Sequence, residues 1–298
     1  MDEYIIQRIA LYVKDAKIVK QLFYIENYRN LIKTSEYHFD ELVLLYKKEN
    51  WASLIHTDNL IIIKSFYRLN IILPIYNYID YAASYGKLEV VKWLYENRKE
   101  DCTAMAMDNA ALNGHIEVVK WLHNNRKEDC CTTDAMDFAA YNGHLEIVKW
   151  LHENREEGCT TDAMDDAARR GHLEVVKWLH ENRKEGCTIW AMNDAASNGH
   201  LEVVKWLHKN RKEGCTIRAI ENAASNGHLE IVKWLHNNRK EGCTIWAMNG
   251  AASNGHLEVV KWLHYNRKEG CTRDAMKYAG YNGHIEVVKW LNDNIKID

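Results

Sequence analysis

The sequence predicts an all-α solenoid built from short repeats of two helices. Eight near-identical units follow one another over residues 77–298. Each unit carries apolar residues at helical spacing on one side, so a single unit cannot cover its own apolar face. Each unit also contains a glycine placed to end a helix. We therefore expect the units to stack, with each unit burying the apolar face of its neighbour.

One glycine marks the same point of every unit and defines the period. It occurs at Gly86, Gly114, Gly143, Gly171, Gly199, Gly227, Gly255 and Gly283. The steps are 28 residues long, apart from one step of 29 that we attribute to Cys131, inserted beside Cys130. Asp58 replaces this glycine in residues 49–76, which we interpret as a degenerate capping repeat.

The first helix of a unit is short, as in residues 162–169. Thr160 or Thr161 is suited to cap its first turn, because a threonine oxygen can accept a hydrogen bond from a free backbone N–H group. Asn-Gly pairs such as Asn198 and Gly199 end the helix, since glycine adopts the left-handed conformation at little cost.

The second helix of a unit begins at a residue such as His172 or Leu173 and continues to about Arg183. Its leucines and valines recur at spacings of three and four residues, which places them on one side of the helix. A tryptophan at the same position in every unit, such as Trp178, widens this apolar side and is interpreted as a packing residue.

The run Ala195-Ala196-Ser197-Asn198-Gly199-His200-Leu201-Glu202-Val203-Val204-Lys205-Trp206-Leu207 resembles the ankyrin repeat. The period is 28 residues where that family has about 33, and the family's Thr-Pro-Leu-His tetrapeptide is absent. We therefore expect compact loops in place of the family's β-hairpins. This variant is similar to the ankyrin arrays of large DNA viruses and some microbes. The resemblance implies a non-enzymatic scaffold that binds a protein partner and needs no cofactor.

Residues 1–48 form a separate N-terminal segment. The run from Asp2 to Ile9, followed by Tyr28-Arg29-Asn30-Leu31-Ile32, faintly resembles an F-box, although the usual Leu-Pro opening is missing. That resemblance implies a substrate receptor that docks onto the adaptor subunit of a cullin-type ubiquitin ligase. The alternative is a helical cap that covers the apolar face of the first repeat.

Composition excludes several classes of function. The net charge of −3 gives no basic excess for binding nucleic acid, and only a repeated Asn-Arg-Lys row favours a weak RNA or phosphate ligand. The apolar stretch around Leu60–Ile63 is too short to span a bilayer. Asp2 and Glu3 stand where a secretory signal would carry basic residues. We expect a monomer in a reducing cytoplasmic or nuclear compartment, which is the host cytoplasm for a viral protein.

Ladders of cysteine and histidine recur through the units without forming a catalytic motif. The cysteines are Cys102, Cys130, Cys159, Cys187, Cys215, Cys243 and Cys271. Equivalent positions in stacked helices lie about 8–10 Å apart, which is too far for disulfide bonds. We interpret these cysteines as small buried residues. The histidines of one unit, such as His172 and His180, lie about 12 Å apart on a helix and cannot share a metal. The first of them is expected to cap a helix or bond the neighbouring loop, with pH sensing as an alternative.

Positions that vary between near-identical units are candidates for partner binding, because packing does not dictate them. One series near the start of the first helix is Asp134, Asp162, Trp190, Arg218, Trp246 and Asp274. A second series, three residues later, includes Asp137, Asp165, Asn193, Glu221 and Asn249. Residues three apart share a helix face, so both series are predicted to form one binding face, with an acidic side that favours a basic partner. The alternative is that both tryptophans pack on adjacent loops.

Overall fold

The computed structural model of the chain describes residues 77–98, 102–126 and 131–295. The chain divides into two compact units, residues 1–131 and residues 132–298. The F-box-like or capping segment 1–48 and the degenerate repeat 49–76 lie outside the described residues. The ubiquitin-ligase interpretation therefore stays a prediction from the sequence.

The described residues form sixteen helices in eight consecutive pairs, with no strand. The first helices of the pairs are α7 (Tyr78–Ser84), α9 (Met105–Leu112), α11 (Asp134–Tyr141), α13 (Asp162–Arg169), α15 (Ile189–Ser197), α17 (Arg218–Ser225), α19 (Ile245–Ser253) and α21 (Arg273–Tyr281). The second helices are α8 (Leu88–Arg98), α10 (Ile116–Asn125), α12 (Leu145–Asn154), α14 (Leu173–Asn182), α16 (Leu201–Asn210), α18 (Leu229–Asn238), α20 (Leu257–Asn266) and α22 (Ile285–Asn294). The predicted all-α repeat architecture is confirmed.

Threonine caps start the first helices, as the sequence predicts. Thr188 is the N-cap of α15, and its Oγ1 accepts a hydrogen bond of 3.1 Å from the backbone N–H of Trp190. Thr244 caps α19 in the same way. At α13 the equivalent bond is accepted by Oγ1 of Thr160 from the backbone N–H of Asp162, whereas the side chain of Thr161 makes no capping bond. Each such bond satisfies one N–H group that the helix itself cannot satisfy.

The turn between the helices of a pair depends on glycine. Gly199 has a φ of 88°, in the left-handed region that other L-residues avoid, and it separates α15 from α16. His200 holds the N-cap position of α16, although its side chain makes no capping bond. The helix ends at Asn210, whose Nδ2 donates a hydrogen bond of 2.8 Å to the carbonyl of Trp206.

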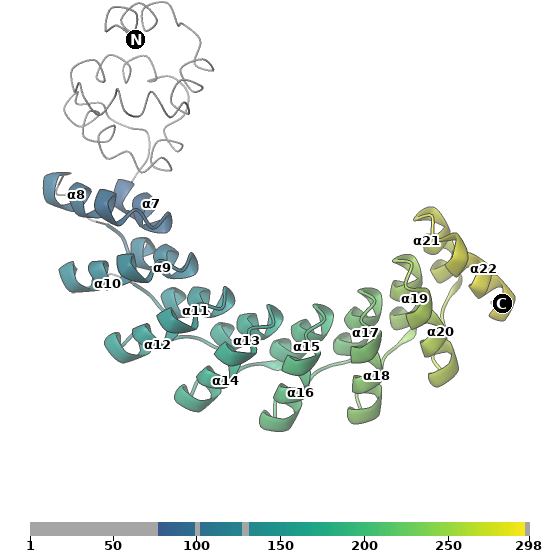
Figure 1. Cartoon of the computed structure of the whole chain (residues 1–298). Helices are drawn as coiled ribbons and strands as arrows, with labels where there is room; N and C mark the ends of the chain where they lie inside the picture. Colours follow the sequence, from purple (N-terminus) through teal and green to yellow (C-terminus); the bar gives the residue numbers. More distant parts are fainter. Residues whose placement is uncertain (1–76, 99–101, 127–130, 296–298) are drawn as a thin grey trace, which may run out of the picture. The chain divides into compact units, whose positions relative to one another are not determined.

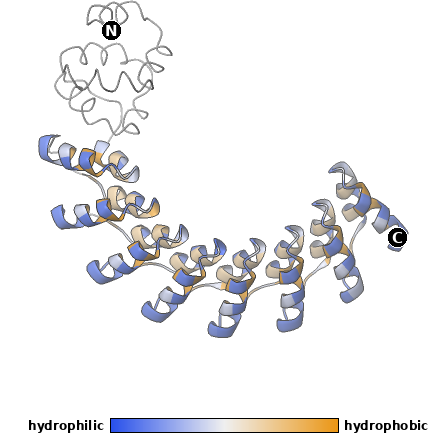
Figure 2. Cartoon of the chain, viewed as in Figure 1, coloured by the Kyte–Doolittle hydropathy of each residue, from blue (hydrophilic) through white to orange (hydrophobic). Residues whose placement is uncertain are grey.

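The hydrophobic core runs along the seam between the two rows of helices. Val203, Val204 and Leu207 of α16 are buried, as are Ala195 and Ala196 of α15. Figure 2 shows this distribution for residues 132–298, where hydrophobic segments lie at the junction of each pair and the free ends of the second helices are hydrophilic.

Residues 132–298 form an arc with the first helices on its inner side (Figure 1). The backbones of neighbouring first helices lie closer together than the backbones of neighbouring second helices do. Side-chain size explains the difference. Paired alanines such as Ala167 and Ala168 are fully buried in the first helices. Rings separate the second helices, as where His180 and Trp206 meet edge to face at 5.2 Å between centroids. Unequal spacing of the two rows bends the stack toward the first helices.

The described part of the compact unit 1–131, considered by itself, shows the same arrangement of helices. The first helices α7 and α9 pack closely together, and each packs on its own second helix. Asp80 of α7 accepts a hydrogen bond of 2.9 Å from the backbone N–H of Thr103 and one of 2.5 Å from its Oγ1. Hydrogen bonds from a threonine to a side chain of the preceding repeat therefore join successive repeats within residues 1–131 and within residues 132–298.

The cysteines of the described residues lie in the loops before the first helices and are free thiols. Cys131, and not Cys130, holds the repeat position, since Cys131 is buried and directly precedes Thr132 just as Cys159 precedes Thr160. This corrects the predicted ladder, and Cys130 lies outside the described residues. Burial raises the pKa of Cys159 to about 11, so this thiol is protonated and unreactive at neutral pH.

Candidate partner-binding surface

The first predicted series of variable residues lies on the surface. Asp134, Asp162 and Arg218 are exposed, and Asp274 is half-buried. Trp190 is 44% exposed and Trp246 is 60% exposed. Both rings therefore reach the surface, which favours the binding interpretation over the alternative that they pack on adjacent loops. An exposed tryptophan presents a large apolar surface whose contact with water is unfavourable, and such residues often anchor protein interfaces.

Arg218 and Trp190 form a pair across two adjacent repeats. The guanidinium carbon of Arg218 lies 5.5 Å from the centroid of the Trp190 ring, within the range of a cation–π contact. Such a contact restrains both long side chains before any partner arrives. Trp246 is the more exposed of the two tryptophans.

The second predicted series is not on the surface, which corrects the prediction. Asp137 is 5% exposed, Asp165 8%, Asn193 0% and Asn249 5%, while Glu221 is half-buried. Each accepts a hydrogen bond from the backbone N–H of a threonine 23 residues later, in the next repeat. These residues hold neighbouring repeats together and are not free to contact a partner.

The bonds of this series are short and paired. Asp165 accepts a hydrogen bond of 2.8 Å from the backbone N–H of Thr188 and a second hydrogen bond of 2.5 Å from its Oγ1. Asn193 forms the corresponding two hydrogen bonds with Thr216. Its Oδ1 accepts one of 2.9 Å from the backbone N–H, and its Nδ2 donates one of 3.1 Å to Oγ1. Aspartate and asparagine are therefore interchangeable in shape here, although only aspartate carries a charge.

Burial raises the pKa of Asp137 to about 6, while the bonds from Thr160 act in the opposite direction. A raised folded-state pKa means that folding disfavours the ionised form. The contribution of Asp137 to stability is therefore largest when the carboxyl is protonated, and it falls as the pH rises from about 4 to about 6.

We expect Asp137→Asn to raise the free energy of unfolding by about 1–2 kcal/mol at pH 7, because it removes a poorly solvated charge but keeps the bonds seen at Asn193. Urea unfolding at pH 4 and pH 7 measures this effect. The stabilisation should shrink at pH 4, where the aspartate of the parent is protonated. Equal stabilisation at both pH values would show that charge is not the cause.

The positions that do share a surface with Trp190 are those four and seven residues later. At the fifth position these are Phe138, Asp166, Asp194, Asn222, Gly250 and Tyr278, and at the eighth they are Tyr141, Arg169, Ser197, Ser225, Ser253 and Tyr281. They are half-buried or exposed throughout. Together with the first series they form what we name the inner stripe. The helices α13, α15, α17 and α19 each contact two neighbouring first helices and their own second helix, so this stripe faces the inside of the arc.

The sequence prediction missed the fifth position. The signal was present in the helical spacing. Side chains four and seven residues after the first series point in nearly the same direction as that series, whereas the side chain three residues after it is turned toward the side that packs. The fifth position also varies in chemistry, from Phe138 through Asp194 to Gly250. Variation of that breadth is typical of a surface whose neighbours impose no constraint.

Charge gathers at the N-terminal end of the inner stripe. Arg169 pairs with Asp166 at 3.2 Å. Burial raises the pKa of Asp166 and of Asp194, and the charge of Arg169 partly opposes the rise in both. Arg170 is directed to Tyr141, where its guanidinium carbon lies 4.3 Å from the ring centroid and Nη2 donates to the hydroxyl.

The first histidine of each unit bonds the preceding repeat. The ring of His200 hydrogen-bonds the backbone of Arg169 and packs against Gly171. Burial lowers the pKa of His200, which favours the neutral ring at neutral pH. The predicted bond to a neighbouring loop is confirmed here, and the alternative of a helix cap is wrong because the N-cap side chains make no capping bond.

The second histidine belongs to a loop network that includes the Asn-Arg-Lys row. Arg183 lies with Nη1 3.3 Å from Nδ1 of His152 in the preceding repeat, and its Nε donates 3.2 Å to Glu185. Arg211, Arg239 and Arg267 repeat this arrangement with the following glutamates. These arginines are therefore engaged within the fold, which argues against the alternative of an RNA or phosphate site on this row.

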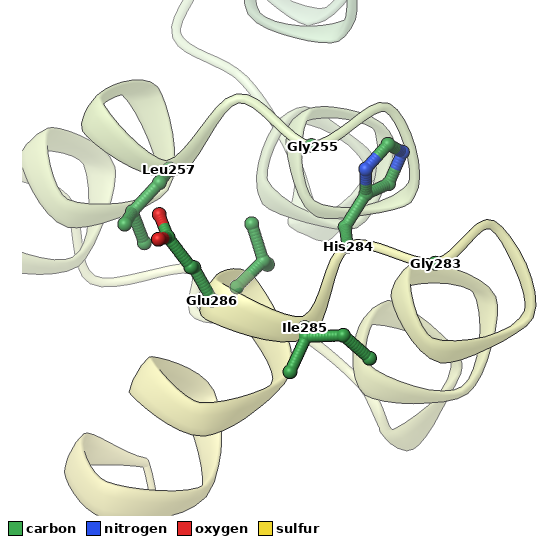
Figure 3. A pocket seen from close by; sticks show the side chains of 7 residues that line it. Gly255, Leu257, Gly283, His284, Ile285 and Glu286 are labelled. Carbon is green, nitrogen blue, oxygen red and sulfur yellow. The ribbon is translucent and has the colours of Figure 1, made fainter.

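A shallow pocket of about 270 Å³ lies at the last helix pair (Figure 3). It is lined by Gly255, Leu257, Gly283, His284, Ile285, Glu286 and Val287. Figure 3 shows the ring of His284 beside Gly255, which is the histidine–glycine contact found between other repeats. The pocket is thus a product of repeat stacking, and its lining offers no nucleophile with an activating base.

Within residues 77–98, 102–126 and 131–295, no group of three or more histidine, cysteine, aspartate or glutamate side chains could hold a metal ion. None of the helices in these ranges combines the length and the apolar character needed to cross a membrane.

Comparison with known proteins agrees with this architecture. A family model described as ankyrin repeats (3 copies) matches residues 79–165, 136–219, 163–249 and 220–298. These segments together cover far more than half of the chain. A search of the curated proteins found no match. Ankyrin repeats are general protein–protein interaction modules and typically serve as non-enzymatic scaffolds. With its stacked helix pairs, glycine turns and family match, the chain belongs to the ankyrin-repeat family.

Proposed function

We propose that this chain binds a protein partner through the inner stripe, with Trp190, Arg218 and Trp246 at its centre. The observation that carries the proposal is the exposure of both tryptophans, 44% and 60%, on first helices whose methionines, such as Met192 and Met248, are buried. Tryptophan and arginine are the residue types most enriched where alanine substitution strongly weakens binding.

The stacked repeats supply a rigid support for this surface. The backbone N–H groups of Trp190 and Trp246 are each held by a threonine cap, at 3.1 Å and 3.2 Å. The side chains therefore project from fixed helix starts and not from loops. Two repeats separate them, which corresponds to about 16–20 Å. A partner that contacts both residues must span that distance.

We expect the double variant Trp190→Ala, Trp246→Ala to weaken partner binding about 30-fold or more, because interface tryptophans each commonly contribute around 2 kcal/mol. Partners captured by the full chain are identified by mass spectrometry, purified and titrated against both proteins by calorimetry. Alanine keeps the helix starts intact, since it has the highest helix propensity.

A matched control separates this surface from general stickiness. Tyr265 is 69% exposed and lies on α20, a second helix on the other side of the stack. The variant Tyr265→Ala removes an exposed ring of similar size away from the stripe, so it should leave the affinity unchanged. Binding that depends on Tyr265 but not on the two tryptophans would overturn the proposal.

A further inference from the structure

The charged side chains on and directly beside the inner stripe differ between its two ends. Toward the N-terminal side of residues 132–298 the exposed charges on the stripe are acidic, at Asp134 and Asp162, with Asp166 and Asp194 beside them. Arg169 offsets part of this charge through its ion pair with Asp166, and the exposed Arg170 beside Tyr141 offsets another part. No ion pair involving Asp134 or Asp162 occurs among the described residues, so these two carboxylates face the space inside the arc uncompensated.

Toward the C-terminal side the balance reverses. Arg273 and Lys277 are not stripe residues, but both are exposed on α21 beside the stripe residues Asp274, Tyr278 and Tyr281, and of these five only Asp274 is acidic. The half-buried carboxylate of Glu221 is held by the next repeat. It accepts hydrogen bonds from the N–H and Oγ1 of Thr244, at 3.0 Å and 2.5 Å. The ammonium of Lys277 lies 5.8 Å from the ring centroid of Tyr281, so the charge stays at the surface beside an exposed ring.

The middle of the stripe is apolar. Besides Trp190 and Trp246, the side chains of Ile189 and Ile217 are 37% and 39% exposed. Arg218 lies among them but is directed onto the Trp190 ring. The order along the stack is therefore acidic at α11 and α13, apolar from α15 to α19, and basic at α21.

We propose that the occupant of the inner stripe is a single extended protein segment with basic residues at one end, apolar residues in the middle and acidic residues at the other. This inference rests on the proposed function and adds the chemistry and the orientation of the partner. The basic end lies against Asp134 and Asp162, the apolar middle against Trp190 and Trp246, and the acidic end against Arg273 and Lys277. Four repeats separate Asp162 from Arg273, about 32–40 Å, which about 10–12 residues span in extended form.

Charge and shape disfavour the other occupants. A nucleic acid or an anionic membrane would meet the carboxylates of Asp134 and Asp162, which repel phosphate. A second copy of the chain, turned end for end, matches in charge. However, the stripe lies on the inner side of the arc, and two concave faces cannot meet along their length. An extended segment fits inside the curve.

The test uses the full chain and a displayed library of random 16-residue peptides as the probe. Selection is expected to enrich peptides with Lys or Arg toward one end, aromatic or aliphatic residues in the middle, and Asp or Glu toward the other end. A selected peptide is then titrated against charge variants by fluorescence anisotropy. Asp134→Arg with Asp162→Arg reverses the acidic end, and the fold accepts arginine at this helix position in Arg218. Arg273→Glu with Lys277→Glu reverses the basic end.

Each charge-reversed variant should bind the selected peptide about 5- to 30-fold more weakly, and the loss should diminish in high salt. A peptide with the matching end reversed in charge should regain most of the affinity. Lys184→Glu with Lys212→Glu, on the loops outside the stripe, is the matched control and should change nothing.

The outcomes separate the two proposals. If peptides bind and depend on Trp190 and Trp246 but ignore both charge reversals, the dipolar segment is wrong and the proposed function stands. If no peptide is enriched, or if binding ignores the tryptophans, both proposals fail. A dimer seen by sedimentation and lost in the charge-reversed variants would overturn the segment in favour of a second copy.

Discussion

Replacing Gly171 with alanine should lower the free energy of unfolding by about 2–4 kcal/mol. Two effects contribute. The backbone of Gly171 has a φ of 80°, where an L-residue is strained by about 1–2 kcal/mol. An added Cβ would also meet Nδ1 of His200 at 2.5 Å and Cε1 at 2.7 Å, closer than carbon atoms can approach. The imidazole cannot simply move aside, because it hydrogen-bonds the backbone of Arg169.

The chain contains its own control for this prediction. Gly283 has the same φ of 80°, but no atom lies within 4 Å of the place where its Cβ would be. The variant Gly283→Ala should therefore show only the backbone strain, about 1–2 kcal/mol. Urea unfolding followed by far-UV circular dichroism measures both variants against the parent. Equal losses would show that contact between histidine and glycine contributes nothing to the coupling of repeats.

Repetition is the reason why so much of the fold could be predicted. A single glycine or a single apolar pattern is a weak signal, but Gly199 and its equivalents report the same turn eight times. The threonine cap was predicted from the chemistry of one position and is observed at Thr188 and Thr244. The place of Cys131 was mispredicted because Cys130 follows Cys102 by 28 residues whereas Cys131 precedes Cys159 by 28, so the period fits one cysteine from each side.

The candidate site was predictable only in part, because variation between repeats has two causes. Trp190 and Arg218 occupy equivalent positions and share no chemistry, which marks a surface position. Asp165, Asn193 and Glu221 also vary, yet each keeps a side-chain oxygen that accepts a hydrogen bond from the next repeat. Both series vary in sequence, and variation alone predicts that both are exposed, although only the first series is.

The position that breaks this second pattern is informative. Lys277 cannot accept a hydrogen bond, and it follows Asn249 in the same series. It belongs to α21, and its side chain is exposed. A polar position that keeps an oxygen acceptor from Asp137 to Asn249, although its size and charge change, is a candidate contact between repeats. Such a comparison needs only the sequence.

Thr188→Val is expected to lower the free energy of unfolding by about 2–4 kcal/mol at pH 7, because one hydroxyl performs two tasks. Its Oγ1 donates a 2.5 Å bond to the buried carboxylate of Asp165 and accepts a 3.1 Å bond from the N–H of Trp190. Valine has nearly the same shape but can form neither bond. Chemical denaturation of the variant measures the loss. Thr161→Val is the matched control, since Thr161 makes no capping bond, and its effect should stay within about 0.5 kcal/mol.

The pH dependence of the Thr188→Val variant tests the electrostatic part of this argument. Burial raises the pKa of Asp165, and the Thr188 hydroxyl lowers it, because the bond favours the ionised form. Removing the hydroxyl raises the folded-state pKa further, so the variant carries its largest deficit at neutral pH and a smaller one in acid, where the carboxyl is protonated. Adding Asp165→Asn should recover part of the stability at pH 7. A deficit that is the same at pH 4 and pH 7, and that Asp165→Asn does not reduce, would mean that only the helix cap was lost and that the buried carboxylate does not depend on Thr188.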